Sequence, residues 1–445
     1  MPSLEQWLAY QAQVHPQAID LGLERVREVL GRLQWRQPDV AVITVAGTNG
    51  KGSVSAYCAT ILTAAGYRVG TFTSPHLRDY RERIRIHDRL VSESELVSAF
   101  DRIEVARGRI GLTFFEFNTL AALLVFAAAK LDAWVLEIGM GGRLDAVNVV
   151  EPDVSVVVSI GLDHQEYLGN TVEAIASEKA GIFRKDRPAV LGSRELPGVV
   201  EDIARTVGAP LKRLGIEFGY RVDGNRWHYC GSKWDLPHLP APALAGCTQF
   251  ANAATAIAAL EELTAAERGG RRLAVTAAAV AQGLEGVRLI GRFQVIQPRT
   301  ASAATWILDV AHNPAAARVL ADNLRAGSGR TLAVCGILSD KDAAGIATEL
   351  RDCIDAWWCI STEGARGQSG EQLAQQVRAQ VSAPVAATES LAEACAAAAE
   401  TARPADRIVV FGSFHTVGPA LDWLETHDLL PTTLHREYTA APSAI

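Results

Sequence analysis

The sequence predicts an α/β protein with two doubly wound domains, an N-terminal phosphate-loop domain and a smaller C-terminal domain. Three observations predict this fold. Short apolar runs rich in β-branched residues alternate with helical patterns over residues 40–191 and again over residues 305–411, as parallel strands crossed by helices do. The chain has 445 residues, more than one ordinary core holds. The first apolar run leads directly into a glycine-rich loop.

Composition excludes several classes of protein. The formal net charge of -7 argues against a general nucleic-acid binder, which usually carries a basic field. The N-terminus lacks the basic start and apolar centre of a signal peptide. The most apolar stretch, residues 119–139, contains Lys130 and Asp132, so it predicts a buried helix and strand rather than a membrane span. Seven cysteines without metal-ligand spacing predict reduced thiols in a cytoplasmic protein.

The N-terminal elements follow from hydrophobic spacing and from capping residues. An amphipathic helix is expected within residues 17–33, before the first strand. In order, the elements expected after it are a strand over 40–45, a helix over 54–65, a strand over 68–73, a half-exposed strand over 79–87, a helix from Ser92, an alanine-rich helix after Phe117, strands over 133–138 and 154–160, a helix from Thr171 and a strand over 188–191.

Residues 40–53, with the sequence VAVITVAGTNGKGS, predict a phosphate-binding loop. Glycines let backbone N–H groups approach an anion, the helix N-terminus adds a favourable dipole, and Lys51 reaches the terminal phosphates. The pattern departs from G-x-x-x-x-G-K-[ST], because Gly52 is inserted before Ser53 and no glycine stands at Val45 or Ala46. An ordinary glycine-rich turn is therefore the alternative. The strand before the loop and the helix after it favour the phosphate loop.

The pattern changes over residues 215–242, where two short β-type runs flank Asp223-Gly224-Asn225 and predict a hairpin. An alanine-rich helix over 250–263 and an inter-domain crossing over 286–298 follow. The second, Rossmann-like domain then alternates strands and helices over 305–310, 314–325, 332–335, 343–351, 356–360, 371–379, 391–402 and 407–411. The predicted domains are residues 1–291 and 292–428, with a disordered tail over 429–445.

Polar residues stand where predicted strands of the first domain end, the edge at which open α/β sheets bind ligands. Ser74, Glu137 and Asp163-His164 each follow or end a strand. A carboxylate buried at Glu137 needs a partner. That partner is either Arg143 or a magnesium ion shared with the Ser74 hydroxyl.

Other candidate residues have ordinary structural interpretations when taken singly. His164 alone is a capping or structural histidine, and Lys179 alone is a surface lysine on a helix. In the second domain, Asp309 ends a strand, and His312-Asn313-Pro314 predicts a turn and a helix start capped by Asn313. The charged stretch 78–89 is either a solvated strand face or an arm for an anionic chain.

Eight motifs in one order resemble the folylpolyglutamate synthase family, and especially its bifunctional bacterial members, which are also dihydrofolate synthases. The resemblance covers roughly residues 18–425 and extends to the related muramyl amino-acid ligases. The motifs are residues 47–53 (GTNGKGS), 74–77 (SPHL), 137–145 (EIGMGGRLD), 163–164 (DH), 178–182 (EKAGI), 291–293 (GRF), 308–314 (LDVAHNP) and 340–342 (DKD).

The resemblance implies a site for ATP, two Mg²⁺ ions and a folate. The implied nucleotide contacts are Thr48, Asn49, Gly50, Lys51, Gly52, Ser53, Asn252, Arg292 and Asp309. The implied metal ligands are Ser74, Glu137, His164 and Lys179, the last as a carbamate formed with CO2. Lys51, Lys179 and His312 are implied in catalysis. The pterin contacts implied are Thr113, Phe114, Phe115, Glu116, Leu144, Asp145 and Ala146.

The implied activity is ATP-driven ligation of L-glutamate to dihydropteroate or to the γ-carboxylate of a reduced folate, through an acyl phosphate. A monofunctional folylpolyglutamate synthase, a muramyl-type ligase and a non-catalytic ATP-binding module are the alternatives. A monomer without nucleic-acid or membrane partners is expected. Met140, Val310 and His415 depart from the residues usual in the family, and His415 is given no role.

Overall fold

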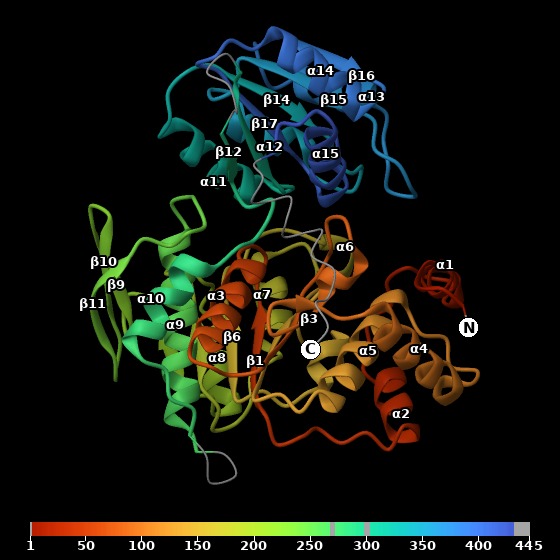
Figure 1. Cartoon of the computed structure of the whole chain (residues 1–445), viewed down its shortest axis with the longest axis vertical. Helices are drawn as coiled ribbons and strands as arrows, with labels where there is room; N and C mark the ends of the chain where they lie inside the picture. The colour runs from red at the N-terminus through yellow and green to blue at the C-terminus, as the bar shows by residue number, and fades with distance from the viewer. Residues whose placement is uncertain (1, 268–271, 298–302, 431–445) are drawn as a thin grey trace. The chain divides into compact units, whose positions relative to one another are not determined.

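The computed structural model describes residues 2–267, 272–297 and 303–430. Contacts divide the chain into two units (Figure 1): Met1–Ala243 with Gln249–Arg288, and Leu244–Thr248 with Leu289–Ile445. The boundary expected after Gly291 stays a prediction, and the tail expected to be disordered lies, from residue 431 on, outside the described residues. Within the described part, no helix has the length and apolar character needed to cross a bilayer.

The first unit contains an eight-stranded sheet in the order β4-β3-β2-β5-β1-β6-β7-β8. Its strands are β1 (Ala41–Ala46), β2 (Val69–Phe72), β3 (Ile84–Ile86), β4 (Arg89–Leu90), β5 (Ala133–Glu137), β6 (Val154–Val157), β7 (Ala189–Leu191) and β8 (Leu211–Arg213). All neighbours are parallel except the edge strands β3 and β4. The carboxyl ends of β1, β2, β5 and β6 therefore share one edge.

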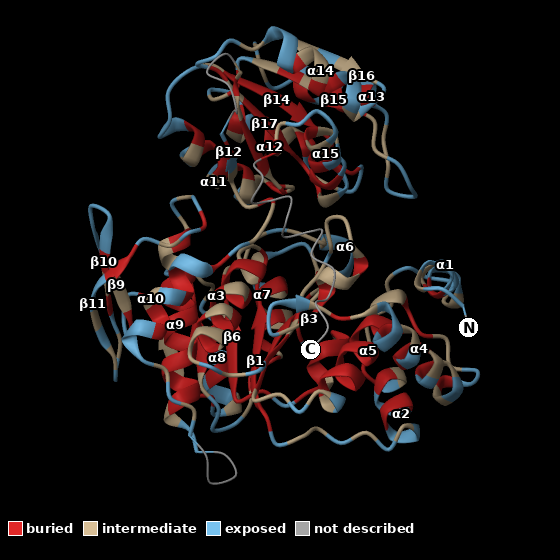
Figure 2. Cartoon of the chain, in the orientation of Figure 1, coloured by how far each residue is buried: buried red, intermediate tan, exposed pale blue. Residues whose placement is uncertain are grey.

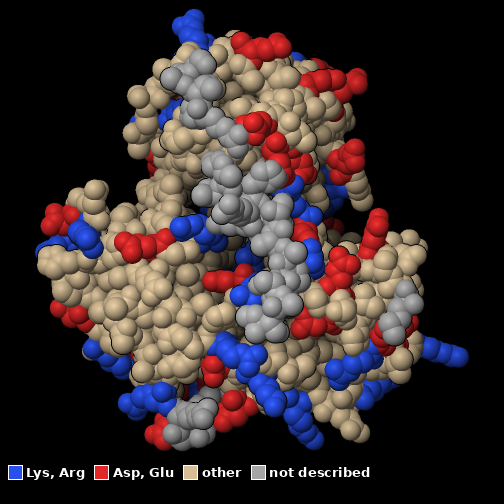
Figure 3. Space-filling view, in the orientation of Figure 1, with Lys and Arg blue, Asp and Glu red and all other residues tan. Residues whose placement is uncertain are grey.

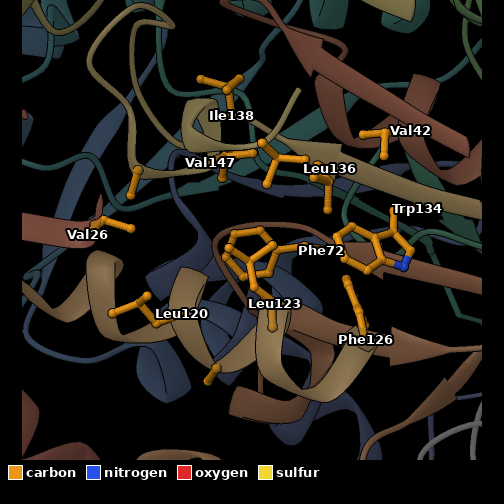
Figure 4. Packing of buried hydrophobic residues seen from close by; sticks show 14 of the residues in the cluster. Val26, Val42, Phe72, Leu120, Leu123, Phe126, Trp134, Leu136, Ile138 and Val147 are labelled. Atoms are coloured by element: carbon orange, nitrogen blue, oxygen red, sulfur yellow. The ribbon is translucent and has the colours of Figure 1, made fainter. Parts of the chain in front are cut away.

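Both faces of this sheet are covered, so its strands are apolar throughout. Every residue of β1 is buried. Val42 and Trp134 point into the large core packed against helix α5, while Ile43 and Val135 alternate to the other face. Figure 4 shows Phe72, Trp134 and α5 side chains interleaved in that core, and Figure 2 shows the same elements as largely buried.

Helices flank the sheet, and their starts follow from local sequence. They are α1 (Leu4–Val14), α2 (Glu24–Arg32), α3 (Lys51–Ala64), α4 (Glu93–Arg107), α5 (Phe114–Ala128), α6 (Gln165–Leu168), α7 (Val172–Ala180), α8 (Val199–Val207), α9 (Gln249–Ala265) and α10 (Ala277–Gly286). Ser92 and Thr113 cap α4 and α5 through capping boxes. Helix α3 begins at Lys51, earlier than predicted, because Gly50 at φ 85° ends the loop.

One expected strand is corrected. Residues 79–87 form the 3₁₀ turn η1 (Tyr80–Arg83) before the short strand β3, instead of one strand. The Asp79 carboxylate accepts a hydrogen bond from the Arg81 N–H, and the Glu82 side chain closes a capping box. This local capping competes with the extended conformation that alternating charge indicates.

A separate three-stranded antiparallel sheet, in the order β11-β10-β9, contains the predicted hairpin. Strands β9 (Gly219–Asp223) and β10 (Arg226–Cys230) join at Asp223-Gly224-Asn225, which confirms that prediction. Strand β11 (Asp235–Pro240) was not predicted, because it contains two prolines. It lies at the edge of the sheet, where proline is tolerated.

The second unit has a six-stranded sheet in the order β12-β13-β17-β14-β15-β16, which confirms two α/β domains. Its elements are β12 (Gln294–Ile296), β13 (Thr305–Asp309), α11 (Pro314–Arg325), β14 (Thr331–Cys335), α12 (Ala343–Leu350), β15 (Ala356–Ile360), α13 (Gly370–Arg378), β16 (Val385–Thr388), α14 (Leu391–Thr401), β17 (Arg407–Phe411) and α15 (Phe414–Thr426). Only β12 is antiparallel to its neighbour. Figure 3 shows acidic and basic side chains interspersed on the visible face.

Candidate active site

The glycine loop after β1 is held to the segment after β6. The Thr48 N–H donates to the Ser159 carbonyl at 2.8 Å, and the Asn49 N–H donates to the Ser159 hydroxyl at 3.0 Å. The Thr48 hydroxyl also donates to the Gly161 carbonyl at 3.1 Å. The loop is therefore preformed, and it leads directly into the N-terminus of α3, where Lys51, Gly52 and Ser53 stand.

Gly50 leaves no room for a side chain. Its φ is 85°, and a Cβ atom there would lie 2.7 Å from Val158 Cγ1 and 3.0 Å from Asn252 Oδ1. Asn252, in the first turn of α9, thus lies beside the glycine loop, as expected of a nucleotide contact. Its amide is held by Gln249 Oε1 at 3.3 Å.

Two lysine ammonium groups meet at one carbonyl of the loop. Lys51 Nζ and Lys179 Nζ each donate to the Gly47 carbonyl at 3.0 Å. Lys179, on α7, is buried, so it is not the surface lysine that its sequence position alone allows. Burial, followed by the nearby charge of Lys51, lowers its pKa to about 7, against the opposing effects of Asp163 and Asp145.

Glu137 and Ser74 lie together at the shared edge of the sheet. Glu137, the last residue of β5, is buried, and the Ser74 N–H points to its Oε2 at 3.4 Å. The alternative partner, Arg143, instead donates two hydrogen bonds to Glu178 Oε1, at 2.7 and 3.1 Å. Among the described residues Arg143 thus pairs with Glu178, and the metal-ligand interpretation of Glu137 stays a prediction.

The loop after β5 is organised by Asp145. Its carboxylate accepts hydrogen bonds from the Met140 N–H at 2.9 Å and the Val147 N–H at 3.0 Å, and it caps the turn η2 (Ala146–Val149). Burial raises its pKa to about 7, although these hydrogen bonds oppose the shift. At Gly142 a Cβ atom would lie 2.6 Å from the Glu178 carbonyl, so the loop packs directly on α7.

His164 lies at the end of the segment that follows β6, at φ 52° before α6. The backbone N–H of His164 donates to Asp163 Oδ1 at 2.9 Å. The His164 side chain does not cap the N-terminus of α6. The loop after β6 thus carries both the residues that hold the glycine loop and His164. This common origin places His164 at the same edge of the sheet as Glu137.

The predicted pterin residues at the start of α5 have defined local roles. Thr113 caps the helix, and Glu116 accepts from the Thr113 N–H at 2.8 Å and from Arg25 Nε at 3.0 Å. Glu116 therefore has partners within the protein and is held in place. Phe115 packs on Phe72, with ring centroids 5.9 Å apart, and fills the space above Gly139.

Arg83 is a residue that sequence reasoning missed, since the charged stretch 78–89 favoured a solvated face. It is buried, and its Nε donates to His76 Nδ1 at 2.8 Å. Its guanidinium lies 5.5 Å from the centre of the Phe114 ring. Burial lowers its pKa, and Glu137 partly opposes the shift. Arg83 thus brings a cation between the predicted metal and pterin residues. The motif 74–77 was the only sequence signal nearby.

The second unit gathers three further predicted residues. Asp309, at the end of β13, accepts from the Phe293 N–H at 2.7 Å and from the Ala311 N–H at 2.8 Å. Burial raises its pKa, while the hydrogen bonds and the charges of Arg292 and His312 oppose the rise. The Asn313 side chain caps α11, as predicted, by accepting from the Ala316 N–H at 2.9 Å.

The first unit's donor set fits a nucleotide and a hard divalent cation. Magnesium prefers carboxylate and hydroxyl oxygens, which Glu137 and Ser74 supply at one place. The helix N-terminus and the Lys51 ammonium suit phosphate oxygens. An ammonium group cannot act as a metal ligand. The lowered pKa of Lys179, however, lets its neutral amine form near pH 7.

Comparison with protein families finds two matches. A family described as "Mur ligase middle domain" matches residues 45–193. A second family, described as "Mur ligase, glutamate ligase domain", matches residues 291–414.

Individual proteins resemble nearly the whole chain. It is 43% identical over 426 residues to the dihydrofolate synthase/folylpolyglutamate synthase of Escherichia coli strain K12, covering 95% of this chain and 96% of that protein. The structure of E. coli FolC in complex with DHPP and ADP superposes with a TM-score of 0.89 at 42% identity, covering 96% and 99%. A bifunctional folylpolyglutamate synthase/dihydrofolate synthase with Mn, AMPPNP and L-glutamate bound gives 0.86 at 42%, covering 96% and 98%.

Proposed function

The chain belongs to the dihydrofolate synthase/folylpolyglutamate synthase family, and we propose that the residues described above carry that family's reaction in this protein. It is an ATP-dependent ligase that uses a divalent metal ion. It joins L-glutamate to dihydropteroate, giving dihydrofolate, and to the γ-carboxylate of reduced folates, which lengthens a polyglutamate chain. The family that the ordered motifs indicated is thereby confirmed.

The observation that carries the residue assignment is the meeting of Lys51 and Lys179 at the Gly47 carbonyl. Two ammonium groups so close repel one another, which favours a neutral Lys179 amine and leaves Lys51 to hold the phosphates. The N–H groups of residues 50–53 at the start of α3 bind the phosphates, and Thr48, Asn49 and Asn252 complete the nucleotide contacts.

Charge neutralisation is the main task of the site. The acceptor carboxylate, already an anion, attacks the γ-phosphoryl group in line, giving an acyl phosphate and ADP. The obstacle is repulsion between two anions, and Lys51 lowers it by holding positive charge at the phosphates. The amine of glutamate then attacks the activated carbonyl, the amide bond forms and phosphate leaves.

Ser74, Glu137 and His164 are proposed to hold two Mg²⁺ ions. Bound there, the ions supply Lewis-acid neutralisation of the phosphoryl oxygens. Lys179 is proposed to add CO2 through its neutral amine, releasing one proton and leaving a carbamate anion on Nζ. Its burial and its lowered pKa favour the neutral amine. The change of sign would remove the repulsion with Lys51 and supply a further oxygen ligand.

The start of α5 and the loop after β5 are proposed to bind the pterin, through Thr113, Phe114, Phe115, Glu116, Leu144, Asp145 and Ala146. Aromatic faces suit a flat ring. Glu116 and Asp145 already accept backbone N–H groups, and each carboxylate has remaining lone pairs for the ring N–H edge. The same hydrogen bonds fix the carboxylates in position before substrate arrives.

Arg292, Asp309 and His312 of the second unit are proposed to take part in nucleotide binding and turnover. A common task is supported by Asp309, whose carboxylate binds the backbone N–H groups of Phe293 and Ala311, the chain neighbours of Arg292 and His312. We further propose a cytoplasmic monomer. All seven cysteines are free thiols, which suits a reducing compartment, and sedimentation of the purified protein would test the oligomeric state.

The deciding experiment is ADP release by the purified protein with ATP, Mg²⁺ and glutamate, with dihydropteroate in one assay and tetrahydrofolate in another. Turnover with both acceptors is expected. Turnover with tetrahydrofolate alone would leave only the chain-lengthening activity and would count against the pterin contacts assigned at α5. Turnover with neither, but with a cell-wall precursor, would assign the protein to the muramyl-type ligases.

A further inference from the structure

Three side chains of metal-ligand type meet on the small sheet, away from the residues assigned to ATP and folate. His228 and Cys230 belong to β10, and Asp235 begins β11. His228 Nε2 lies 2.6 Å from Asp235 Oδ1 and 3.5 Å from Cys230 Sγ. All three ligand atoms lie within 4.8 Å of one another. Nothing in the proposed ligase reaction uses them.

Strand geometry explains why these side chains converge. His228 and Cys230 are two residues apart on one strand, so they point to the same face. Cys230 and Asp235 are direct partners in the antiparallel register of β10 and β11. Cys230 and Asp235 are exposed and His228 is half-buried, so an ion from solvent can reach the three ligand atoms.

The opposite face of the hairpin is anchored in the unit, which holds the ligand face steady. Trp227 and Tyr229 are buried there, and the Tyr229 hydroxyl donates to Glu261 Oε2 at 2.6 Å. Glu261 Oε1 also accepts the Trp234 N–H at 2.9 Å in the connection between the strands. A Cβ atom at Gly231 would lie 2.1 Å from Glu261 Oε2, so the connection packs tightly on α9.

The arrangement differs from a nucleophilic triad. In a triad, the two ring nitrogens of histidine face different partners, the nucleophile and the carboxylate. Here a single nitrogen, Nε2 of His228, faces both the Cys230 thiol and the Asp235 carboxylate. Convergence of three atoms on one point is instead the geometry of a metal site.

We propose that His228, Cys230 and Asp235 form a surface site for Zn²⁺ or a similar borderline divalent ion. Around tetrahedral zinc, imidazole nitrogen and thiolate sulfur lie about 3.6 Å apart and nitrogen and carboxylate oxygen about 3.4 Å apart. The nitrogen–sulfur distance of 3.5 Å already matches. The 2.6 Å contact between His228 and Asp235 lengthens by about 0.8 Å when the ion enters between them.

The charges at the site balance. A neutral imidazole, a thiolate and a carboxylate together neutralise a divalent ion, and the ion displaces the thiol proton to solvent. Three protein ligands leave a fourth position for water, as in open zinc sites. The bound ion would cross-link β10 to the edge strand β11.

Cobalt(II) tests the proposal in the full-length protein with saturating Mg²⁺ and ADP present. Tetrahedral cobalt bound by a cysteine thiolate gives near-ultraviolet charge-transfer absorption, which an oxygen-rich site does not give. One equivalent of cobalt should produce this absorption, and one equivalent of Zn²⁺ should abolish it. Cys230→Ser should remove the charge-transfer band, and His228→Ala should weaken cobalt binding by about tenfold or more.

Cys247→Ser is the matched control, because Cys247 is the other exposed cysteine and lies in the second unit. It should keep the cobalt spectrum and the ligase activity unchanged, and Cys230→Ser should keep the activity too. The proposal is overturned if the wild-type protein shows no thiolate band, if Cys230→Ser retains the band, or if Cys247→Ser loses it. None of these results depends on the substrate assigned to the ligase.

Discussion

Lys179 is a buried amine placed 3.0 Å from a carbonyl of the phosphate loop. An ordinary lysine is almost fully charged near pH 7, whereas burial and then the charge of Lys51 lower the pKa of this one to about 7, which makes its neutral amine available near that pH. The same two causes make the amine available to CO2. A residue that the sequence shows only as a helix lysine thus acquires its chemistry from what surrounds it.

Replacing Lys179 by alanine should lower kcat about a hundredfold or more, since the site loses the carbamate oxygens that are proposed to hold a metal ion beside the phosphates. A short carboxylic acid such as acetate should restore part of the rate by supplying the missing carboxylate. Steady-state ADP release with and without acetate measures both effects. The matched control is Lys185→Ala, at an exposed position just after the same helix. A near-normal rate in Lys179→Ala would exclude the carbamate.

The pH dependence of stability offers a second test of Lys179, in CO2-free buffer without nucleotide or metal. Below pH 7 the lysine is protonated in both the folded and the unfolded chain. Between about 7 and its ordinary pKa of 10.5 only the unfolded chain keeps the proton. The free energy of unfolding should therefore rise with pH by up to about 1.4 kcal/mol per unit. Urea titrations at several pH values should show a shallower rise for Lys179→Met; equal slopes would contradict the lowered pKa.

The sequence identified the candidate residues whose position follows from their own strand or motif. It missed those whose neighbours come from distant parts of the chain. Glu137 and Ser74 were found because each stands at the end of a strand, and parallel strands end at one edge. Arg83 was missed because nothing in an alternating charged stretch shows that a turn will bury its guanidinium beside Phe114. The pairing of Arg143 with Glu178 likewise depends on the packing of α7 against a distant loop.

At the scale of elements, the glycine loop between β1 and α3 is held in place by the segment after β6. The loop's backbone is held by Ser159 and Gly161, and its last glycine contacts Val158 and Asn252. At Gly50, two properties of glycine matter for nucleotide binding: the absence of a side chain, which lets Val158 and Asn252 lie close, and the freedom to adopt a positive φ. Gly66 has a positive φ but no close neighbours, so a comparison of the two glycines distinguishes these properties.

Gly50→Ala should abolish ADP binding, whereas Gly66→Ala should leave it intact. Both glycines have positive φ, 85° and 89°, so each substitution should cost about 1–2 kcal/mol of stability. Only at Gly50 does the new methyl meet neighbouring atoms; at Gly66 nothing lies within 4 Å. Calorimetric titration with ADP and thermal unfolding of both variants separate strain from steric exclusion. Equal loss of ADP affinity would show that backbone strain alone matters.

Most elements could be predicted, because strands buried on both faces are continuous apolar runs and because helices begin at caps such as Ser92 and Asn313. Strand β11 could not, since its prolines indicate a loop until its edge position is known. The 3₁₀ turn at Tyr80–Arg83 depends on a capping box that alternating charge conceals. Helix α15 contains Pro419 and was not predicted either.

At the scale of the whole molecule, the chain divides into two units with separate hydrophobic cores. The first core includes Leu120 on α5, and the second includes Leu320 on α11, and both side chains are buried. A large core of its own lets each unit melt as a cooperative body.

Calorimetric unfolding should therefore show two transitions. Leu320→Ala should lower the midpoint temperature of one transition, because the lost burial and the cavity left behind reduce the stability of that unit by about 2–5 kcal/mol. Leu120→Ala should lower the midpoint temperature of the other transition. A single transition that both substitutions shift equally would contradict independent cores.

The two exposed cysteines have a use beyond chemistry, because each unit carries one of them. Cys230 belongs to the first unit and Cys247 to the second, while the remaining thiols are buried or half-buried. Burial raises the pKa of both thiols, so maleimide dyes should be attached above pH 8. A fluorophore attached to either thiol would report on the segment that carries it, without an engineered label site.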